Sequence, residues 1–337
     1  MGNGISVIAL PQWYREWATK YGKLGFITAS ESLKWDVSQD AADLSGKVHL
    51  ITGSNCGIGF EAAKEVSRRK GTVHMLCRNA ERGEAARLDI IAHSGNPQVY
   101  LHAVDVSSIA SVRAFSESFL ANNKKIDVLV NNAGILAVDR EQSEDGIESC
   151  LAVALGGTYL LTSLLLPALR AASPSVVINV TSAGMYLAKT DVHDLQISKV
   201  KTYDGFLQYC RVKRAQVELS EIFTEKLAKS GVSFHSMHPG YAVTPGVEKL
   251  PAFGTKEPGG FIDQHGPSLR SAAQGADTIS WMASAPSVRA TSGLLFFDRQ
   301  PTHTSFPLTG TTLSKKEKEI LWEECGKLMG YVPTPPL

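Results

Sequence analysis

A glycine-rich turn decides the fold, and it reads Thr52-Gly53-Ser54-Asn55-Cys56-Gly57-Ile58-Gly59. The apolar run 48–51 precedes it, and a helical pattern follows over about 58–70. Glycines in a strand–turn–helix unit permit a tight turn and let backbone N–H groups approach a pyrophosphate, and the helix N-terminus adds a partial positive charge. The pattern therefore predicts a dinucleotide-binding turn, although such turns also use glycine for steric reasons alone.

Strand-like and helix-like segments alternate along the chain after this turn. Strands are expected at 48–51, 72–77, 99–104, 126–130, 176–180, 232–237 and 294–297. Helices are expected at 58–70, 80–94, 108–122, 145–171 and 206–229. Uniformly apolar strands that alternate with helices indicate a parallel sheet covered on both faces. The predicted fold class is α/β: a doubly wound Rossmann-type parallel sheet of about seven strands, with helices on both faces.

The sequence divides into three parts. Residues 46–300 form the predicted α/β domain, in which the Pro- and Gly-rich stretch 241–270 is interpreted as a lid or binding loop, with a passive surface loop as the alternative. Residues 301–337 form a C-terminal extension with a helix. Residues 1–45 form an aromatic amphipathic extension, in which Trp13, Trp17 and Tyr21 share one helix face. That face is expected to dock on the protein's own core or, alternatively, to touch a membrane.

Composition argues against several function classes. The 34 Lys and Arg residues against 33 Asp and Glu leave a net charge of +1, which disfavours a nucleic-acid-binding protein. The five cysteines are scattered without a CxxC pair, so we expect a reducing compartment and neither a disulfide framework nor a zinc site. The chain has no HExxH or GxSxG motif, so neither a bound metal nor a hydrolase is expected. No apolar run is long enough to predict a membrane-spanning helix.

The end of the second predicted strand indicates which dinucleotide would bind. An NAD site usually has a carboxylate about 20 residues after the glycine turn, where it binds the ribose 2′-hydroxyl. This chain has Arg78 there, 19 residues after Gly59. A guanidinium suits a 2′-phosphate through charge-assisted hydrogen bonds. The sequence therefore favours NADP(H), with NAD(H) as the alternative cofactor.

Tyr209 and Lys213 are the most informative pair of residues in the sequence. They lie four positions apart on the predicted helix 206–229, and therefore on one face of it. An ammonium near a phenol favours the phenolate and would lower the tyrosine pKa, which suits a general acid or base for a carbonyl and its alcohol. Ser182 ends the fifth predicted strand, and its hydroxyl could bind the same substrate oxygen.

Together these motifs resemble the short-chain dehydrogenase/reductase (SDR) superfamily. The matches, which occur in the expected order over about 46–300, are the Thr52–Gly59 turn, Asn131-Asn132-Ala133-Gly134, Ser182, Tyr209-x3-Lys213, and Pro239-Gly240 with Thr244. The 27-residue gap between Ser182 and Tyr209 resembles the retinol-dehydrogenase-like branch. Finer matches at Gly71-Thr72-Val73-His74 and Met237-His238-Pro239-Gly240 narrow the resemblance to one member of the family.

The resemblance implies an NADP(H)-dependent carbonyl reductase or alcohol dehydrogenase that acts on a small lipophilic substrate. It implies that Tyr209 is the general acid or base, that Lys213 tunes it and binds the nicotinamide ribose, and that Ser182 positions the carbonyl. The expected cofactor-binding residues are Gly53, Asn55, Gly57, Ile58, Gly59, Arg78, Asp105, Asn132, Tyr209, Lys213 and Thr244. Many members have an asparagine in the fourth helix that helps a water relay protons, and here that position is Ala154. A homodimer through the long helices is common in the superfamily and stays an open alternative to a monomer.

The N-terminus suggests a second property. Met1-Gly2-Asn3-Gly4-Ile5-Ser6 fits the pattern for N-myristoylation, with an ordinary terminus as the alternative. One acyl chain binds membranes only marginally, so the aromatic face with Lys20 and Lys23 would supply the second contact. We therefore expect an intracellular protein, either cytoplasmic or peripherally attached to a membrane through an N-myristoyl group. The alternative function is a membrane-tethered, catalytically weak protein that binds NADP(H) as a sensor or scaffold.

Overall fold

The computed structural model describes residues 4–35, 42–244 and 265–333. It forms a single eight-stranded sheet with the order β3-β2-β1-β4-β5-β6-β7-β8. The strands are β1 (Val48–Thr52), β2 (Thr72–Cys77), β3 (Val99–Ala103), β4 (Val128–Asn131), β5 (Ser175–Val180), β6 (Val232–Met237), β7 (Leu295–Phe297) and β8 (Gln300–Thr302). All neighbours pair in parallel except β7 and β8. The predicted α/β fold with a parallel sheet is confirmed, and the short antiparallel edge strand β8 is an addition that the sequence did not reveal.

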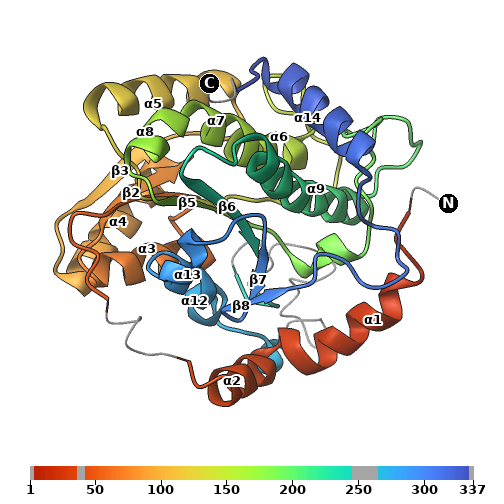
Figure 1. The fold of residues 1–337 in the computed structure, drawn as a ribbon, viewed down its shortest axis with the longest axis horizontal. Coiled ribbons are helices and arrows are strands. Elements are labelled where there is room, and N and C mark those ends of the chain that lie inside the picture. Colours follow the sequence, from red (N-terminus) through yellow and green to blue (C-terminus); the bar gives the residue numbers. More distant parts are fainter. Residues whose placement is uncertain (1–3, 36–41, 245–264, 334–337) are drawn as a thin grey trace.

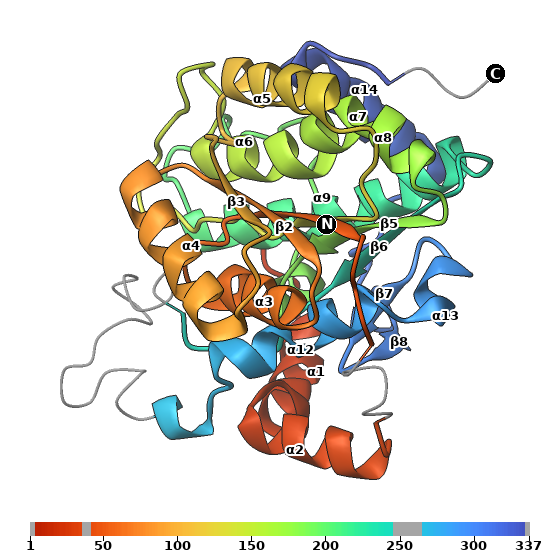
Figure 2. The same ribbon diagram turned by 90° about the vertical axis from the view of Figure 1, so that its left-hand side faces the viewer.

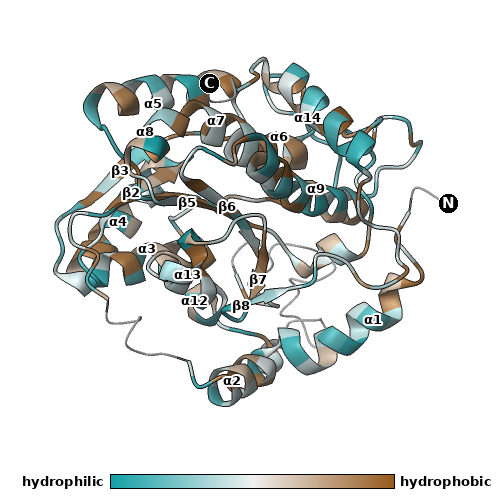
Figure 3. Ribbon diagram, viewed as in Figure 1, coloured by the Kyte–Doolittle hydropathy of each residue, from teal (hydrophilic) through white to brown (hydrophobic). Residues whose placement is uncertain are grey.

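Helices cover both faces of the sheet (Figure 2). One face carries α3 (Gly57–Arg68), α4 (Ala80–Ser94) and α12 (Ala272–Met282), and the other carries α5 (Ile109–Asn122), α6 (Ser149–Leu155), α9 (Gly205–Lys226) and α14 (Lys315–Met329). The central strands are buried on both sides: Val128 and Val130 of β4 join one core cluster, and Leu129 between them joins the other. Figure 3 shows the hydrophobic residues concentrated in these strands and the polar ones on the outer helices. Double-sided burial explains why the strands read as continuous apolar runs.

The helical stretch expected over 145–171 changes its winding in the structure. It consists of α6, a π-helical turn η3 (Gly156–Leu161), α7 (Thr162–Leu164) and α8 (Leu166–Ala171). A Cβ on Gly156 would lie 1.6 Å from the carbonyl oxygen of Val106, so the backbones touch where the helix changes its winding. Pro167 in the first turn of α8 is compatible with a helix start there. The long helical stretch predicted over about 145–171 is therefore found, and the change of winding within it is what the sequence did not reveal.

The N-terminal extension lies along the edge of the sheet that carries β7 and β8 (Figure 1). It consists of α1 (Ala9–Glu16), the π-helical turn η1 (Trp17–Tyr21) and α2 (Lys23–Ser32). Its aromatic face packs against the third core cluster, with Tyr21 only 2% exposed and in edge-to-face contact with His238. Of the two interpretations of this face, the structure shows docking on the protein's own core. Among the described residues, no helix is both long enough and apolar enough to cross a bilayer.

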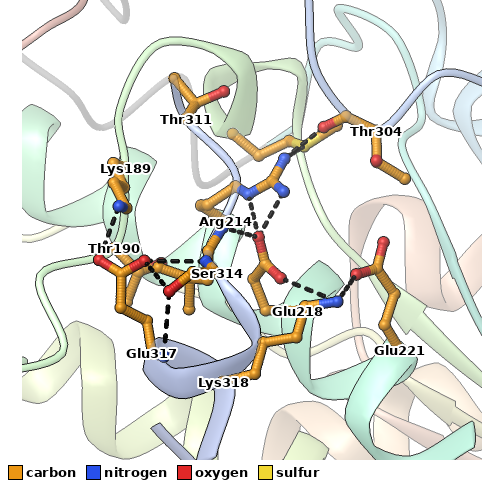
Figure 4. A network of polar contacts seen from close by, with 12 residues as sticks. Lys189, Thr190, Arg214, Glu218, Glu221, Thr304, Thr311, Ser314, Glu317 and Lys318 are labelled. Atoms are coloured by element: carbon orange, nitrogen blue, oxygen red, sulfur yellow. Dashed lines mark hydrogen bonds and ion pairs between the residues drawn. The ribbon is translucent and has the colours of Figure 1, made fainter. Parts of the chain in front are cut away.

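The C-terminal segment is attached to α9 through a buried ionic network (Figure 4). Arg214 and Glu218 lie one turn apart on α9, both fully buried, and the Arg214 guanidinium donates to Glu218 and to the carbonyl oxygen of Thr304. Lys318 of α14 lies 3.7 Å from Glu218 and 2.6 Å from Glu221. The network thus joins the helix that carries Tyr209 and Lys213 to the last helix of the chain.

Candidate functional site

One cavity of about 1010 Å³ lies over the carboxyl ends of the central strands, where ligands of open α/β sheets bind. The predicted site residues that line it are Gly53, Asn55, Gly57, Ile58, Arg78, Asp105, Asn132, Ser182, Tyr209, Lys213 and Thr244. Gly59 does not line the cavity, because it faces the protein interior. A Cβ there would lie 2.4 Å from Asn132 Nδ2 and 2.6 Å from the Gly53 carbonyl oxygen, so Gly59 serves the close packing of α3 on the turn.

The glycine turn is fixed to the end of β4 by hydrogen bonds. Asn132 Nδ2 donates to the carbonyl oxygens of Thr52 and Gly53 at 2.9 and 3.2 Å, and Thr52 Oγ1 accepts from the backbone N–H of Asn132 at 3.0 Å. Gly53 and Gly57 adopt positive φ angles of 65° and 60°. Helix α3 starts at Gly57, and the side chain of its N-cap residue, Cys56, makes no capping hydrogen bond. Its first N–H groups are therefore left for an anionic ligand such as a pyrophosphate.

Two arginines line the cavity after β2. Arg78 is exposed directly after the strand, where the sequence predicted it, and Arg82 lies one turn into α4. Asn79 between them caps α4 by accepting from the Arg82 backbone N–H at 2.8 Å. Sequence reasoning missed Arg82. Its position in the first turn of a helix that Asn79 caps would have placed it close to Arg78. Asp105 lines the same region while its Oδ1 accepts from the Ser107 backbone N–H at 2.9 Å.

Tyr209 is half-buried and lines the cavity together with Ser182, whose hydroxyl acts on the Tyr209 phenol as a hydrogen-bond partner. Burial raises the pKa of Tyr209 above its usual range, and the hydrogen bond with Ser182 opposes that rise. The Nζ of Lys213, which the sequence expects to lower this pKa, lies 5.7 Å from the Tyr209 ring centre. In this arrangement the Tyr209 phenol is protonated at neutral pH and can act as an acid.

Lys213 is buried beside Tyr209 and anchored by two acceptors. Its Nζ donates to the Val180 carbonyl oxygen and to Gln216 Oε1, both at 2.9 Å, and burial lowers the Lys213 pKa to about 8. Gln216 Nε2 in turn donates to Thr158 Oγ1 at 2.8 Å. Two of the three ammonium donors are thus occupied, which leaves the third for the cavity. Gln216 has no motif around it, so sequence reasoning missed it.

Ala154 lies away from this arrangement. Its side chain is 4% exposed within α6 and belongs to the core cluster between the sheet and helices α5, α6, α9 and α14. It does not line the cavity. Thr158, one turn later in η3, is the residue of this segment that reaches the Lys213–Gln216 pair.

Over β4, β5 and β6 the cavity has apolar walls, formed by Trp13, Leu136, Val138, Phe206 and Tyr241. Tyr241 begins the predicted lid or binding loop 241–270, whereas the other four were not predicted as site residues, because they come from segments far apart in the chain. Most of the predicted lid 241–270 lies outside the described residues, since 245–264 are not described. The two ends of that stretch meet in a parallel bridge between Ala242 and Arg270.

Comparisons with known proteins agree with this geometry. Residues 47–193 match the family model of short chain dehydrogenases. Human dehydrogenase/reductase SDR family member 12 is 39% identical, with 92% of this chain and 94% of that protein covered, and bovine retinol dehydrogenase 12 is 34% identical, with 87% and 90% covered.

Solved structures share the fold. A putative uncharacterized protein from Mycobacterium paratuberculosis superposes with a TM-score of 0.69 at 26% identity, covering 90% of this chain and 99% of that one. L-sorbose reductase from Gluconobacter frateurii, complexed with NADPH and L-sorbose, gives a TM-score of 0.59 at 23% identity, covering 77% and 96%. The identity to curated relatives over most of the chain decides the assignment, and the chain belongs to the short-chain dehydrogenase/reductase family of oxidoreductases.

Proposed function

We propose that this protein is an NADP(H)-dependent oxidoreductase that interconverts a carbonyl and an alcohol on a lipophilic substrate, with Tyr209 as the general acid or base. The observation that carries the proposal is the meeting of Ser182, Tyr209 and Lys213 on one cavity with the glycine turn at its other end. Retinol dehydrogenases among the relatives agree with a lipophilic alcohol or aldehyde as the substrate class.

The residues present fit a nicotinamide dinucleotide. The uncapped first turn of α3 offers N–H groups to a pyrophosphate, and the third donor of Lys213 is free for a ribose hydroxyl. When bound, the cofactor supplies or accepts the hydride. The chain's own part is to hold the carbonyl oxygen by the Ser182 hydroxyl and to give it the Tyr209 phenolic proton. In the reverse direction the same phenol oxygen takes the proton from the alcohol.

The cofactor preference is proposed from the charges near the ribose. Arg78 follows β2 where NAD-specific sites have a carboxylate, and Arg82 adds a second guanidinium on the same cavity. We expect Arg78→Ala to weaken NADPH binding by about 10- to 100-fold and to leave NADH binding nearly unchanged, because only NADPH carries the 2′-phosphate. Titration of both nucleotides by nicotinamide fluorescence measures this.

Arg87→Ala is the matched control, since Arg87 also lies on α4 but pairs with Glu84 and does not line the cavity. Equal affinity for NADPH and NADH in the unmodified protein would contradict the proposed preference, and tighter binding of NADH would favour NAD(H) as the cofactor. Binding of neither nucleotide would overturn the proposed function as a whole.

Peripheral membrane attachment is a second proposal, favoured by apolar side chains that the N-terminal extension leaves exposed. Val7 and Leu24 are 77% and 75% exposed, and Ile8, Ile27 and Leu33 are exposed beside them. The proposed acceptor of the myristoyl group, Gly2, lies outside the described residues. The intracellular location and the homodimer also stay predictions.

Flotation with phosphatidylcholine–phosphatidylserine vesicles tests the attachment, with protein co-expressed with an N-myristoyltransferase. The unmodified sequence should float with the vesicles, Gly2→Ala should remain in solution, and Leu24→Glu should bind severalfold more weakly, because one acyl chain alone gives marginal binding. Equal flotation of all three proteins would contradict the proposal. A catalytically weak sensor or scaffold would keep its cellular function when Tyr209 is replaced by phenylalanine.

A further inference from the structure

The N-terminal extension reaches into the candidate active site. Trp13 of α1 lines the same cavity as Ser182 and Tyr209. It contacts Ala183, which lies 170 positions further along the chain. Its Nε1–H donates to the carbonyl oxygen of Ala183 at 3.1 Å. Ala183 directly follows Ser182, and a Cβ on the next residue, Gly184, would lie 3.7 Å from both Ser182 Oγ and the Tyr209 ring. The indole is therefore attached to the segment that carries the predicted catalytic serine.

Contacts on both sides of Trp13 hold the extension in place. On the N-terminal side, the Ser6 backbone N–H donates to the Leu187 carbonyl oxygen at 2.7 Å. On the C-terminal side, the buried Arg270 guanidinium donates to the carbonyl oxygens of Tyr21 and Lys20 at 3.0 and 2.8 Å. The backbone N–H of Tyr241, another wall residue, also donates to the Tyr21 carbonyl oxygen, at 2.8 Å. Trp13 is thus a fixed wall rather than part of a loose tail.

The order of the strands separates the cavity into two chemically different halves. The charged lining residues Arg78, Arg82, Asp89 and Asp105 follow β2 and β3 at one edge of the sheet. The half over β4, β5 and β6 has the apolar walls, and Lys213 is the charged residue among those described there. A substrate in this half should therefore carry no charge, and its carbonyl or alcohol should be its main polar group. A charged substrate would have to lose its water shell against apolar walls.

We propose that Trp13 is a specificity-determining residue. The N-terminal extension is the outer wall of the substrate half, and its indole selects uncharged aldehydes and alcohols with an extended apolar chain or ring that packs on it. This inference rests on the proposed oxidoreductase function and adds the element that recognises the substrate. An indole offers a large, rigid apolar surface for such packing.

The experiment compares Trp13→Ala, Trp13→Phe and Trp17→Ala with the unmodified protein. Trp17 is the matched control: it lies in the same extension and packs edge-on against His265, but does not line the cavity. The readout is kcat/KM with NADPH for straight-chain aldehydes from butanal to dodecanal. We expect Trp13→Ala to lower kcat/KM for dodecanal by about tenfold or more relative to butanal, and Trp13→Phe to keep most of the preference. Trp17→Ala should change all aldehydes equally, because it only loosens the extension.

Calorimetric binding of decan-1-ol to the NADP⁺-loaded protein gives a second readout that does not depend on turnover. Weaker decanol binding in Trp13→Ala alone, with unchanged NADPH affinity, supports the proposal. The same loss in Trp13→Ala and Trp17→Ala, or no loss in either, overturns it and leaves Trp13 as a structural residue. Failure of the unmodified protein to bind NADPH is a different result, because it removes the proposed function itself.

Discussion

Burial acts on Tyr209 and Lys213 in opposite directions, and this defines the pH range in which they can work together. It raises the pKa of Tyr209 and lowers that of Lys213 to about 8. Below pH 8 the ammonium keeps three N–H donors, of which Val180 and Gln216 use two. Above pH 8 the neutral amine has lost a donor and its charge. The two N–H groups that remain are held by Val180 and Gln216, so the donor that is lost is the one that faces the cavity.

We therefore expect kcat/KM for carbonyl reduction to fall as the pH rises through about 8, measured from about pH 6 to pH 10. Gln216→Glu should move this fall to higher pH, because a carboxylate beside Lys213 favours its charged form. Gln216→Leu should move it to lower pH, because it removes an acceptor for the ammonium. Identical profiles in the two variants would show that Lys213 does not control the pH dependence.

Tyr209→Phe tests the acid directly. The substitution keeps the ring and removes the phenolic hydroxyl, so turnover should fall by about 100- to 10,000-fold while NADPH affinity stays unchanged. Tyr203→Phe is the control, because Tyr203 donates to Glu148 at 2.9 Å and does not line the cavity. Turnover that survives in Tyr209→Phe would assign the proton transfer to another group.

At the scale of elements, the features that could be predicted from the sequence are those that depend on residues close together in the chain. Strands β1–β6 were readable because burial on both faces makes each a continuous apolar run. The change of winding at Gly156 could not be predicted, because it depends on the contact between Gly156 and Val106, which lie 50 positions apart. The glycine turn and the Tyr209–Lys213 spacing are local and were found. Trp13 and Gln216 acquire their places only through tertiary contacts, and the periodicity of a helix does not say what its face meets.

Helix α9 offers a test of the buried network in Figure 4. Glu218 pairs with Arg214, and its Oε1 also accepts from the Leu313 backbone N–H at 3.1 Å. Glu218→Gln leaves the Arg214 charge buried without its counter-ion, so the free energy of unfolding should fall by about 3–5 kcal/mol, measured by urea denaturation. Glu65→Gln breaks a similar Arg–Glu pair on the surface of α3, with Arg68, and should cost less than about 1 kcal/mol. Equal losses would mean that burial does not determine the value of the pair.

The whole molecule is built so that segments outside the central α/β unit complete the site. The C-terminal segment fixes α9 through Glu218, and the N-terminal extension supplies Trp13 to the cavity. Arg270 is the central contact of the extension: its guanidinium is 2% exposed, binds Asp298 at 2.5 and 2.8 Å, and lies 5.2 Å from the Phe26 ring centre. The same residue ends the stretch whose other end is paired at Ala242. One side chain therefore links the extension to the base of the predicted lid.

The double variant Arg270→Met with Asp298→Asn should release the extension while leaving no buried charge unpaired. Loss of the charge-assisted bonds to the Lys20 and Tyr21 carbonyl oxygens should raise the open population by about tenfold or more, and trypsin should then cleave after Lys20 and Lys23 correspondingly faster. NADPH affinity should stay nearly unchanged, because Arg270 does not line the cavity and the charged residues of the cofactor half follow β2 and β3. Glu218→Gln is the control, since a globally destabilised protein should be cleaved throughout and not first in the extension. Unchanged cleavage after Lys20 in the double variant would show that packing of Tyr21, rather than Arg270, holds the extension on the protein.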